Sequence, residues 1–383
     1  MMEIEQLWEE IDSRVACLPA RQTGLMQALH RAAAEDILSP GEFPAFDHSS
    51  MDGFAFSSVQ PGRCRVTGTI AAGRPLPLQV ASGTAVRILT GACIPEGTAA
   101  IARQEDCAVE GEDVSLSPGA RIAFGENIRR RGGVFRKGDI LVRSGTAITP
   151  GAIALLASVG VRSLKVTGPA SVLHLVTGDE VVGSATSLLP GQIHDSNGPM
   201  ISALLADMGL AAESRHVPDD GDSLVNRVRE TPADLLLISG GAGPGERDHA
   251  LDALKSAGYA IHSSRLNSRP GKPLIFATKG PGIAFGLPGN PLSHWVCFQA
   301  FVKRAILRLH GLPVPEMLGT RMSAKIAPSR DGRRTWTPGA WDSGSGRVRP
   351  LPWKHSGDLT PLVDANALIL DPTDEGTARM LIL

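Results

Sequence analysis

The chain has 383 residues, with 38 Lys and Arg against 39 Asp and Glu, and a formal net charge of -1. This length exceeds what one ordinary hydrophobic core organises, so we expect several domains. The balanced charge excludes a global basic field that would attract nucleic acid or an acidic membrane, so any anion must be bound by a local site.

The rest of the composition narrows the class of protein. The 43 Gly and 28 Pro are typical of many turns and short strands. Five scattered cysteines without Cys-x-x-Cys spacing argue against a structural zinc site and a disulfide framework, and they fit a reducing cytoplasm. The first residues are acidic rather than a signal peptide, and no apolar run reaches about 18 residues. We therefore expect a cytoplasmic protein that binds neither membrane nor nucleic acid.

Three helices are predicted around the first domain. Ile4, Leu7 and Ile11 recur at helical spacing, and a second helix is expected over Thr23–Leu38, with its first residue as the N-cap. A third is expected over Pro150–Gly160, with proline in its first turn and glycine at its end. These segments indicate a scaffold or an interface.

A small β domain is predicted between these helices. Segments Arg63–Gly68 and Ala85–Thr90 alternate with period two, which predicts strands. Segment Phe43–Phe56 crowds two Asp, two Ser and one His among turn formers, and it is either a polar hairpin entry or a ligand loop. The basic run Arg129–Gly133 is either a solvated turn or a phosphate contact.

An alternating α/β domain follows, and then a tail of short strands. The expected elements are strands Ser171–Val176 and Leu235–Ile238, helices Met200–Gly209 and Ala250–Gly258, strand Leu274–Ala277, and a long helix from Pro291 to Leu309. Pieces such as Thr335–Thr337 and Ala367–Leu370 predict a small β-barrel or sandwich at the end of the chain.

Five loops of the α/β domain carry chemistry at the expected strand ends, where ligands of open α/β sheets bind. They are Asp179-Glu180, Asp195, Gly240–Asp248, Arg265–Lys272 and Gly289-Asn290. Glycines let backbone N–H groups approach a phosphate, and cations attract it, but several carboxylates would repel it unless a divalent cation lies between them. The loops therefore predict a Mg²⁺-assisted site for a nucleotide or similar phosphate ester. The glycine loop taken alone could equally be a tight turn, and the P-loop, Gly-x-Ser-x-Gly and His-Glu-x-x-His motifs are absent.

Eight motifs, in order, resemble the MoeA family, the molybdopterin molybdenumtransferases, which are gephyrin E-domain-like. They are Phe46–Ala55, Arg87–Ala92, Asn127–Gly132, Thr177–Glu180, Asp195–Asn197, Ser239–Asp248, Arg269–Pro273 and Gly286–Pro291. The resemblance implies a multidomain α/β plus β fold. Its parts are a helical linker and dimerisation domain at residues 1–43 and 140–168, a small β domain at 44–139, a three-layer α/β/α, MogA-like molybdopterin-binding domain at 169–312, and a C-terminal β-barrel at 313–383.

The resemblance also implies the reaction and its partners. Family members hydrolyse adenylylated molybdopterin with Mg²⁺ and insert molybdate into the dithiolene, which gives molybdenum cofactor and AMP. A MogA-like molybdopterin adenylyltransferase supplies the substrate. The enzymes are elongated homodimers whose sites lie between the α/β domain of one subunit and the small β domain of the other.

Site residues are carried over by motif. Catalytic roles are implied for Asp52, Thr90, Glu180 and Asp248, and metal binding for Glu180, Asp219 and Asp248. Substrate binding is implied for Arg131, Asp195, Ser239, Gly240, Gly241, Gly245, Arg265, Arg269, Lys272, Pro288 and Ser293. Arg265 and Arg269 are lysines in some relatives, and arginine keeps the charge and adds a bidentate fork for phosphate.

One pair of residues departs from the family pattern. Gly133-Val134 follow Arg129–Gly132, where the family has Glu-Asp, so a carboxylate near the site is missing. This leaves open a weakened or altered enzyme, and also a non-catalytic carrier that binds molybdopterin intermediates. An unrelated nucleotide hydrolase on the same α/β domain is a third hypothesis, but it leaves Ser49–Gly53 unexplained.

Overall fold

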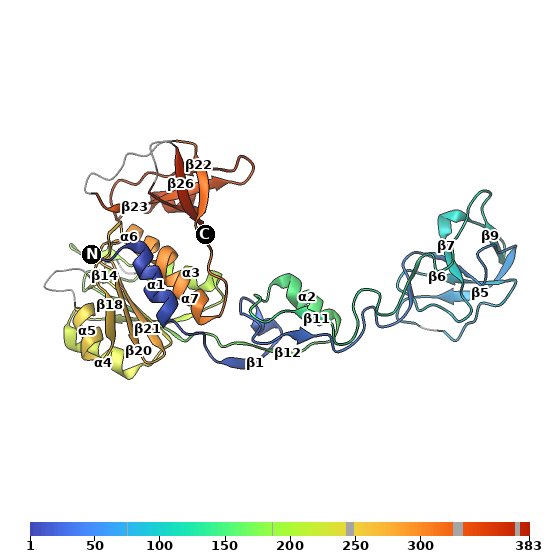
Figure 1. The fold of residues 1–383 in the computed structure, drawn as a ribbon, viewed down its shortest axis with the longest axis horizontal. Coiled ribbons are helices and arrows are strands. Elements are labelled where there is room, and N and C mark those ends of the chain that lie inside the picture. Colours follow the sequence, from blue (N-terminus) through green and yellow to red (C-terminus); the bar gives the residue numbers. More distant parts are fainter. Residues whose placement is uncertain (75, 186, 243–248, 325–331, 372–375) are drawn as a thin grey trace.

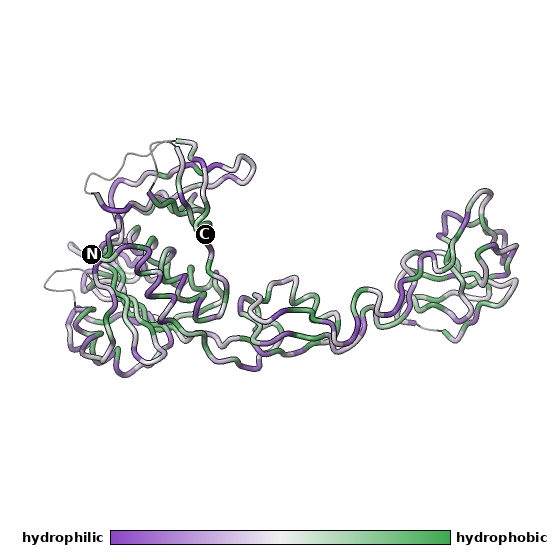
Figure 2. Tube along the Cα trace, in the orientation of Figure 1, coloured by the Kyte–Doolittle hydropathy of each residue, from purple (hydrophilic) through white to green (hydrophobic). Residues whose placement is uncertain are grey.

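The molecule is elongated, with globular parts at both ends of a slender linker (Figure 1). The structure, a computed structural model, describes residues 1–74, 76–185, 187–242, 249–324, 332–371 and 376–383. The α/β domain and the C-terminal barrel lie together at one end, and the small β domain lies at the other (Figure 1). Hydrophobic stretches occur in every part (Figure 2), and separate clusters of buried apolar side chains give each part its own core. No helix among the described residues is long and apolar enough to cross a membrane.

The α/β domain is built on a six-stranded sheet with helices on both faces. In sheet order its strands are β16 (Ala212–Val217), β13 (Val172–Thr177), β17 (Leu235–Ser239), β21 (Gly282–Leu287), β20 (Ile275–Lys279) and β18 (Ala260–Ser263). Its helices are α3 (Asn197–Asp207), α4 (Gly221–Glu230), α5 (Ala250–Ser256), α6 (Pro291–Cys297) and α7 (Lys303–Leu309), the last two joined by a π-helical turn at Phe298–Val302. The three-layer prediction is confirmed.

The aliphatic run of the central strand β17 is explained by burial of both faces of the strand. Leu235 and Leu237 join the core that contains α3, α6 and α7, while Leu236 and Ile238 join the core that contains α4 and α5. A strand covered on both faces must be apolar at every position. Strands β13, β17 and β21 are parallel and in register, so their carboxyl ends meet at one edge of the sheet.

Helix α1 (Ile4–Arg14) packs on the α/β domain, although the sequence grouped it with the linker. Its buried residues contribute to the same core as α6 and α7. Arg304 of α7 donates to both carboxylate oxygens of Asp12, at 2.9 and 2.6 Å, and the Trp8 indole donates to the carbonyl of Ala300 at 2.9 Å.

The linker is mainly paired strands, and the helix predicted over Thr23–Leu38 is wrong. Strand β1 (Ala20–Gly24) pairs with β12 (Ser163–Thr167), and β2 (Ile37–Leu38) with β11 (Ile140–Val142). A single 3₁₀ turn, η1 (Met26–Ala28), interrupts the segment. Its backbone groups bond to chain more than a hundred residues away, which outweighs local helical spacing. The predicted helix after residue 149 is confirmed as α2 (Pro150–Ser158), capped by the Thr149 side chain.

The small β domain is a six-stranded sheet. In sheet order its strands are β7 (Ala100–Arg103), β4 (Gly53–Phe56), β6 (Thr84–Ile88), β5 (Cys64–Ile70), β9 (Asp113–Leu116) and β8 (Cys107–Glu110). Short strands β3 (His48–Ser49) and β10 (Ile128–Arg129) pair beside it, and a 3₁₀ turn η2 spans Gln104–Asp106. A Cβ on Gly53 would lie 1.9 Å from the carbonyl oxygen of Ala102, so β4 can pair so closely only with glycine there.

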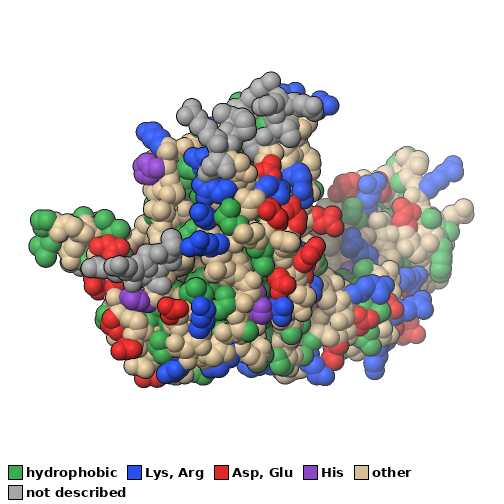
Figure 3. Space-filling view, turned by 60° about the vertical axis from the view of Figure 1, so that its left-hand side comes forward, with side chains coloured by type: hydrophobic (Ala, Val, Ile, Leu, Met, Phe, Trp, Pro, Cys, Tyr) green, Lys and Arg blue, Asp and Glu red, His purple; other side chains and the backbone are tan. Residues whose placement is uncertain are grey.

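The C-terminal domain is a closed five-stranded barrel, as predicted. Its strands are β22 (Leu318–Met322), β23 (Arg334–Asp342), β24 (Arg347–Pro350), β25 (Ala367–Leu370) and β26 (Thr377–Ile382), with a 3₁₀ turn η4 at Thr360–Val363. The β23–β25 pairing closes the barrel. Strand β19 (Ser268–Arg269) of the α/β domain pairs in parallel with the start of β23, which fastens the two domains together. Basic and acidic side chains are interspersed on the face shown in Figure 3, in line with the balanced charge.

Candidate functional site

A cavity of about 500 Å³ opens where the parallel strands of the α/β domain end. Short strands β14 (Val181–Val182) and β15 (Ile193–His194) form part of its wall. Seven predicted site residues line it: Glu180, Asp195, Asp219, Ser239, Gly240, Gly241 and Pro288. The structure therefore brings together loops that are up to about a hundred residues apart in the sequence.

The backbone after β17 passes so close to Thr177 that glycine is required there. Gly240 has φ of +90°, and a Cβ on it would lie 2.8 Å from Oγ1 and 3.0 Å from the carbonyl oxygen of Thr177. Gly241 also has a positive φ, of +63°. Backbone without side chains at the end of a β-strand suits the approach of an anionic group.

Two carboxylates on the cavity wall could hold a divalent cation. Glu180 follows β13 and Asp219 follows β16, and both line the cavity. The other predicted ligand, Asp248, lies outside the described residues, as does Gly245. Among the residues that are described, no group of three His, Cys, Asp or Glu side chains forms a ready metal site. A Mg²⁺ held by one or two carboxylates with water and substrate phosphate is consistent with this pair.

Asp195 and Asn197 begin helix α3 at the cavity wall. Asp195 Oδ1 accepts the Gly198 N–H at 2.8 Å, so one carboxylate oxygen is used to start the helix. The Asn197 amide donates to the Gly289 carbonyl at 2.8 Å, while its Oδ1 is buried without a partner. Leaving a buried acceptor unpaired is costly, so this oxygen is suited to receive a donor from a ligand or water. Asn197 belongs to the Asp195–Asn197 motif, but the sequence alone predicts no role for its side chain.

The three predicted cations of the Arg265–Lys272 loop do not line this cavity. Arg265 and Lys272 line an adjoining cavity of about 220 Å³, which shares Ala242 and Pro273 with the larger one. Arg269 lies over the Trp353 ring of the barrel domain, 5.5 Å from its centroid. A ligand that spans both cavities would have its negative charge near Arg265 and Lys272.

Ser293, predicted to bind substrate, does not line either cavity. It is buried on α6, only 4% exposed.

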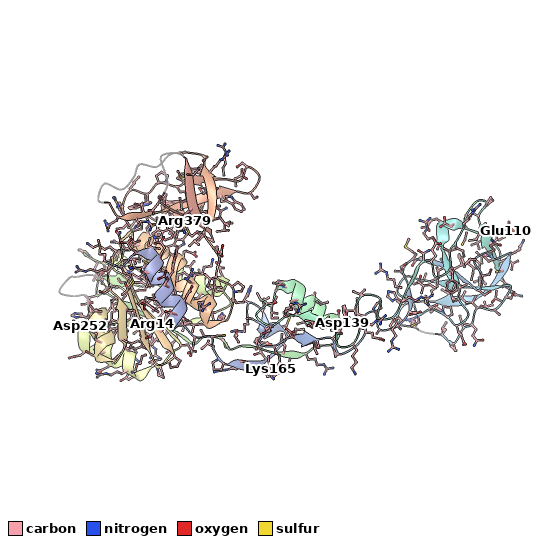
Figure 4. All side chains as sticks on the ribbon, viewed as in Figure 1. Arg14, Glu110, Asp139, Lys165, Asp252 and Arg379 are labelled. Carbon is pink, nitrogen blue, oxygen red and sulfur yellow. The ribbon has the colours of Figure 1, made fainter. Side chains whose placement is uncertain are left out.

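Asp52, just before β4, and Thr90, just after β6, form a pair in the small β domain. The backbone N–H and the hydroxyl of Thr90 both donate to Asp52 Oδ1 at 2.7 Å. The hydroxyl bond, followed by the backbone bond, lowers the pKa of Asp52 below its usual range. Figure 1 places this domain at the opposite end of the molecule from the α/β domain, as do Glu110 and Asp252 in Figure 4. The pair therefore does not reach the cavity of its own chain.

Arg131, in the small β domain, forms an ion pair with Glu42. It lines a separate cavity of about 600 Å³ together with Phe43 and His48. Val134, where the family pattern has a carboxylate, is 66% exposed.

Two buried histidines beneath the cavity were missed by sequence analysis. His174 on β13 and His294 on α6 are fully buried, and the Ser239 hydroxyl lies between them, 2.6 Å from His174 Nε2 and 3.3 Å from His294 Nε2. Burial lowers the pKa of each histidine to about 4. The Ser239 side chain, predicted to contact substrate, therefore points into the core.

Comparisons with known proteins find similar sequences and a similar fold over most of the chain. Three family models match, described as the MoeA N-terminal region (domain I and II) over residues 2–160, a probable molybdopterin binding domain over 174–308, and the MoeA C-terminal region (domain IV) over 321–379. The molybdopterin molybdenumtransferase of Haemophilus influenzae is 36% identical over 299 residues, which is 75% of this chain and 72% of that protein. That of Staphylococcus aureus strain Mu50 is 31% identical over 383 residues, covering 96% and 91%. The crystal structure of the molybdopterin biosynthesis MoeA protein from Pyrococcus horikosii superposes with a TM-score of 0.77 at 26% identity, covering 100% of this chain and 99% of that one.

Proposed function

The chain belongs to the MoeA family of molybdopterin molybdenumtransferases, and we propose that it is itself such an enzyme. In this reaction water cleaves adenylylated molybdopterin to release AMP, and molybdate enters the dithiolene to give molybdenum cofactor. The observation that carries the proposal is the strand-end cavity, which combines bare glycine backbone, three carboxylates and the adjoining cations Arg265 and Lys272 within the matched molybdopterin-binding region. We propose that the enzyme is a cytoplasmic homodimer that takes its substrate from a MogA-like adenylyltransferase.

Each wall of the cavity has a task in this reaction. The backbone at Gly240 and Gly241 approaches the substrate phosphate, and the Asn197 Oδ1 accepts an N–H or O–H of the substrate. Glu180 and Asp219 would hold Mg²⁺, which neutralises phosphate charge and favours attack by water.

The cations of the Arg265–Lys272 loop complete the site. Arg265, Arg269 and Lys272 supply positive charge for molybdate and phosphate. Arg269 is held against Trp353, so the barrel domain limits where this charge can lie.

Purified protein is expected to release AMP from adenylylated molybdopterin when both molybdate and Mg²⁺ are present. Chromatographic measurement of AMP with either ion omitted provides the control, because the proposed reaction couples cleavage to molybdate and needs the cation at the phosphate. Absence of AMP from the complete mixture would refute the transferase function.

Replacing Val134 tests whether the missing carboxylate limits turnover. Val134→Asp is expected to raise the rate of AMP release severalfold, because it restores an acidic group where the family pattern has one. At 66% exposure the substitution should change the free energy of unfolding by no more than about 0.5 kcal/mol.

Val134→Asn is the matched control, since it has the shape of aspartate without its charge. Equal rates for wild type and both variants would show that this position does not limit the reaction. A non-catalytic carrier, the other interpretation of Val134, predicts tight binding of the adenylylated pterin with no AMP release from wild type.

A further inference from the structure

A continuous chain of hydrogen bonds runs beneath the cavity from the sheet edge to a cavity loop. Ser214 Oγ lies 3.4 Å from His174 Nδ1, and His174 Nε2 lies 2.6 Å from Ser239 Oγ. Ser239 Oγ lies 3.3 Å from His294 Nε2, and His294 Nδ1 lies 2.9 Å from the Pro288 carbonyl oxygen. Strands β16, β13 and β17, helix α6 and the loop after β21 each contribute one residue.

The direction of every bond in this chain follows from one fixed acceptor. A carbonyl oxygen can only accept, so His294 Nδ1 carries the proton. The ring is fully buried and neutral at pH 7, so its Nε2 is an acceptor and the Ser239 hydroxyl must donate to it.

The rest of the chain is then determined. The hydroxyl proton of Ser239 is committed to His294, so His174 Nε2 must be the donor to Ser239 Oγ. The neutral His174 ring then accepts at Nδ1 from the Ser214 hydroxyl. With both rings neutral, each ring nitrogen has a suitable partner, and the arrangement has a single consistent polarity.

We propose that His294 is a positioning residue that holds the Pro288 loop through its Nδ1–H, and that Ser239 and His174 fix the tautomer and orientation of its ring and so help to shape the substrate cavity. The inference rests on the proposed function, because it assigns a role in substrate binding to residues that do not touch the substrate. Ser239 and Pro288 both line the cavity, while the histidines lie behind them. The Ser239 hydroxyl therefore serves the network, and its backbone forms the cavity wall.

Two replacements of His294 separate the two bonds that it makes. In His294→Asn the side-chain amide occupies the place of Nδ1 and can still donate to Pro288, but the contact with Ser239 is lost. In His294→Gln the amide reaches the place of Nε2 and can still accept from Ser239, but the bond to Pro288 is lost. Both variants leave a void in the core and are expected to lower the melting temperature.

The expected result is a difference in KM between these variants. His294→Gln should raise the KM for adenylylated molybdopterin about tenfold with kcat within about twofold, because the loop has lost its anchor but the reacting groups remain. His294→Asn should keep the KM within about threefold of wild type. A network that only stabilises the fold would give KM values that follow the melting temperature and not the kind of amide.

Equal KM values in wild type and both variants, or a larger rise in His294→Asn, would overturn the inference while leaving the transferase function intact. Calorimetric titration with AMP gives a second readout that needs no turnover. If wild type releases no AMP in the assay, the proposed function fails by itself. The network is then judged by AMP affinity, where wild type and His294→Asn should bind more tightly than His294→Gln, and equal affinities would refute it.

Discussion

A heterodimer of the Asp52→Ala and Glu180→Ala variants is expected to recover about half of the wild-type rate of AMP release, although each variant alone should be slower than wild type by about 100-fold or more. The reason is the shape of the subunit. Asp52 belongs to the small β domain, which lies at the opposite end of the molecule from the α/β domain whose cavity Glu180 lines (Figure 1). We propose that each site takes Asp52 from one subunit and Glu180 from the other.

Counting sites gives the expected rate. In the heterodimer one site combines both substitutions, while the other combines the intact Asp52 of one subunit with the intact Glu180 of its partner. Purification through two different tags isolates this species, and the rate per dimer should be about half that of wild type. An unpurified equal mixture with free subunit exchange should reach about a quarter.

The pair of Asp52→Ala with Thr90→Val is the matched control. Thr90 donates twice to Asp52, so both substitutions fall in the same half of the proposed site, and each site of that heterodimer carries one of them. It should stay as slow as the single variants. Recovery in this control, or none in the Asp52→Ala and Glu180→Ala heterodimer, would refute a site shared between subunits.

Local patterns were sufficient for buried strands, because an unbroken aliphatic run can be recognised without knowledge of the strands that pair with it. The aliphatic run after Asp234 predicted a buried strand. The acids after β13 predicted a site, because parallel strands bring their carboxyl ends together at one edge of the sheet. The pattern failed over Thr23–Leu38, where pairing with β11 and β12 decides the conformation. Spacing within one segment contains no information about such distant partners.

The residues that line the cavity could be predicted from the sequence, but the buried histidines behind them could not. Family motifs pointed to Glu180, Asp219 and the glycines, which do line one cavity. His174 and His294 gave no signal, because a single histidine in an apolar run has no recognisable spacing, and its role depends on Ser239 lying between the two rings. The position of Arg269 also depends on docking of the barrel domain.

Mild acid is expected to destabilise the α/β domain strongly, by about 6 kcal/mol between pH 7.5 and pH 5.0. Burial lowers the pKa of three histidines, His174, His294 and His310, to about 4 each, and it also lowers that of His262. An unfolded histidine titrates near 6.5, so below that pH the unfolded chain binds protons that the folded chain does not. The contribution of these groups is complete above pH 6.5 and is lost as the pH falls toward 4, at about 2 kcal/mol for each of the three by pH 5.0.

The variant His310→Gln should remove the contribution of one of these three histidines to the pH dependence of stability. The ring accepts the Ala170 N–H through Nε2 at 3.4 Å, and a glutamine carbonyl can accept the same bond without titrating. At pH 7.5 the variant should differ little from wild type in urea unfolding, whereas at pH 5.0 it should be more stable by about 2 kcal/mol. When unfolding at pH 5.2 is measured by proton uptake, the variant should take up about one proton fewer per chain than wild type. The same proton uptake in both proteins would mean that His310 is already charged in the folded state, as a buried cation beside Arg31, and would refute this prediction.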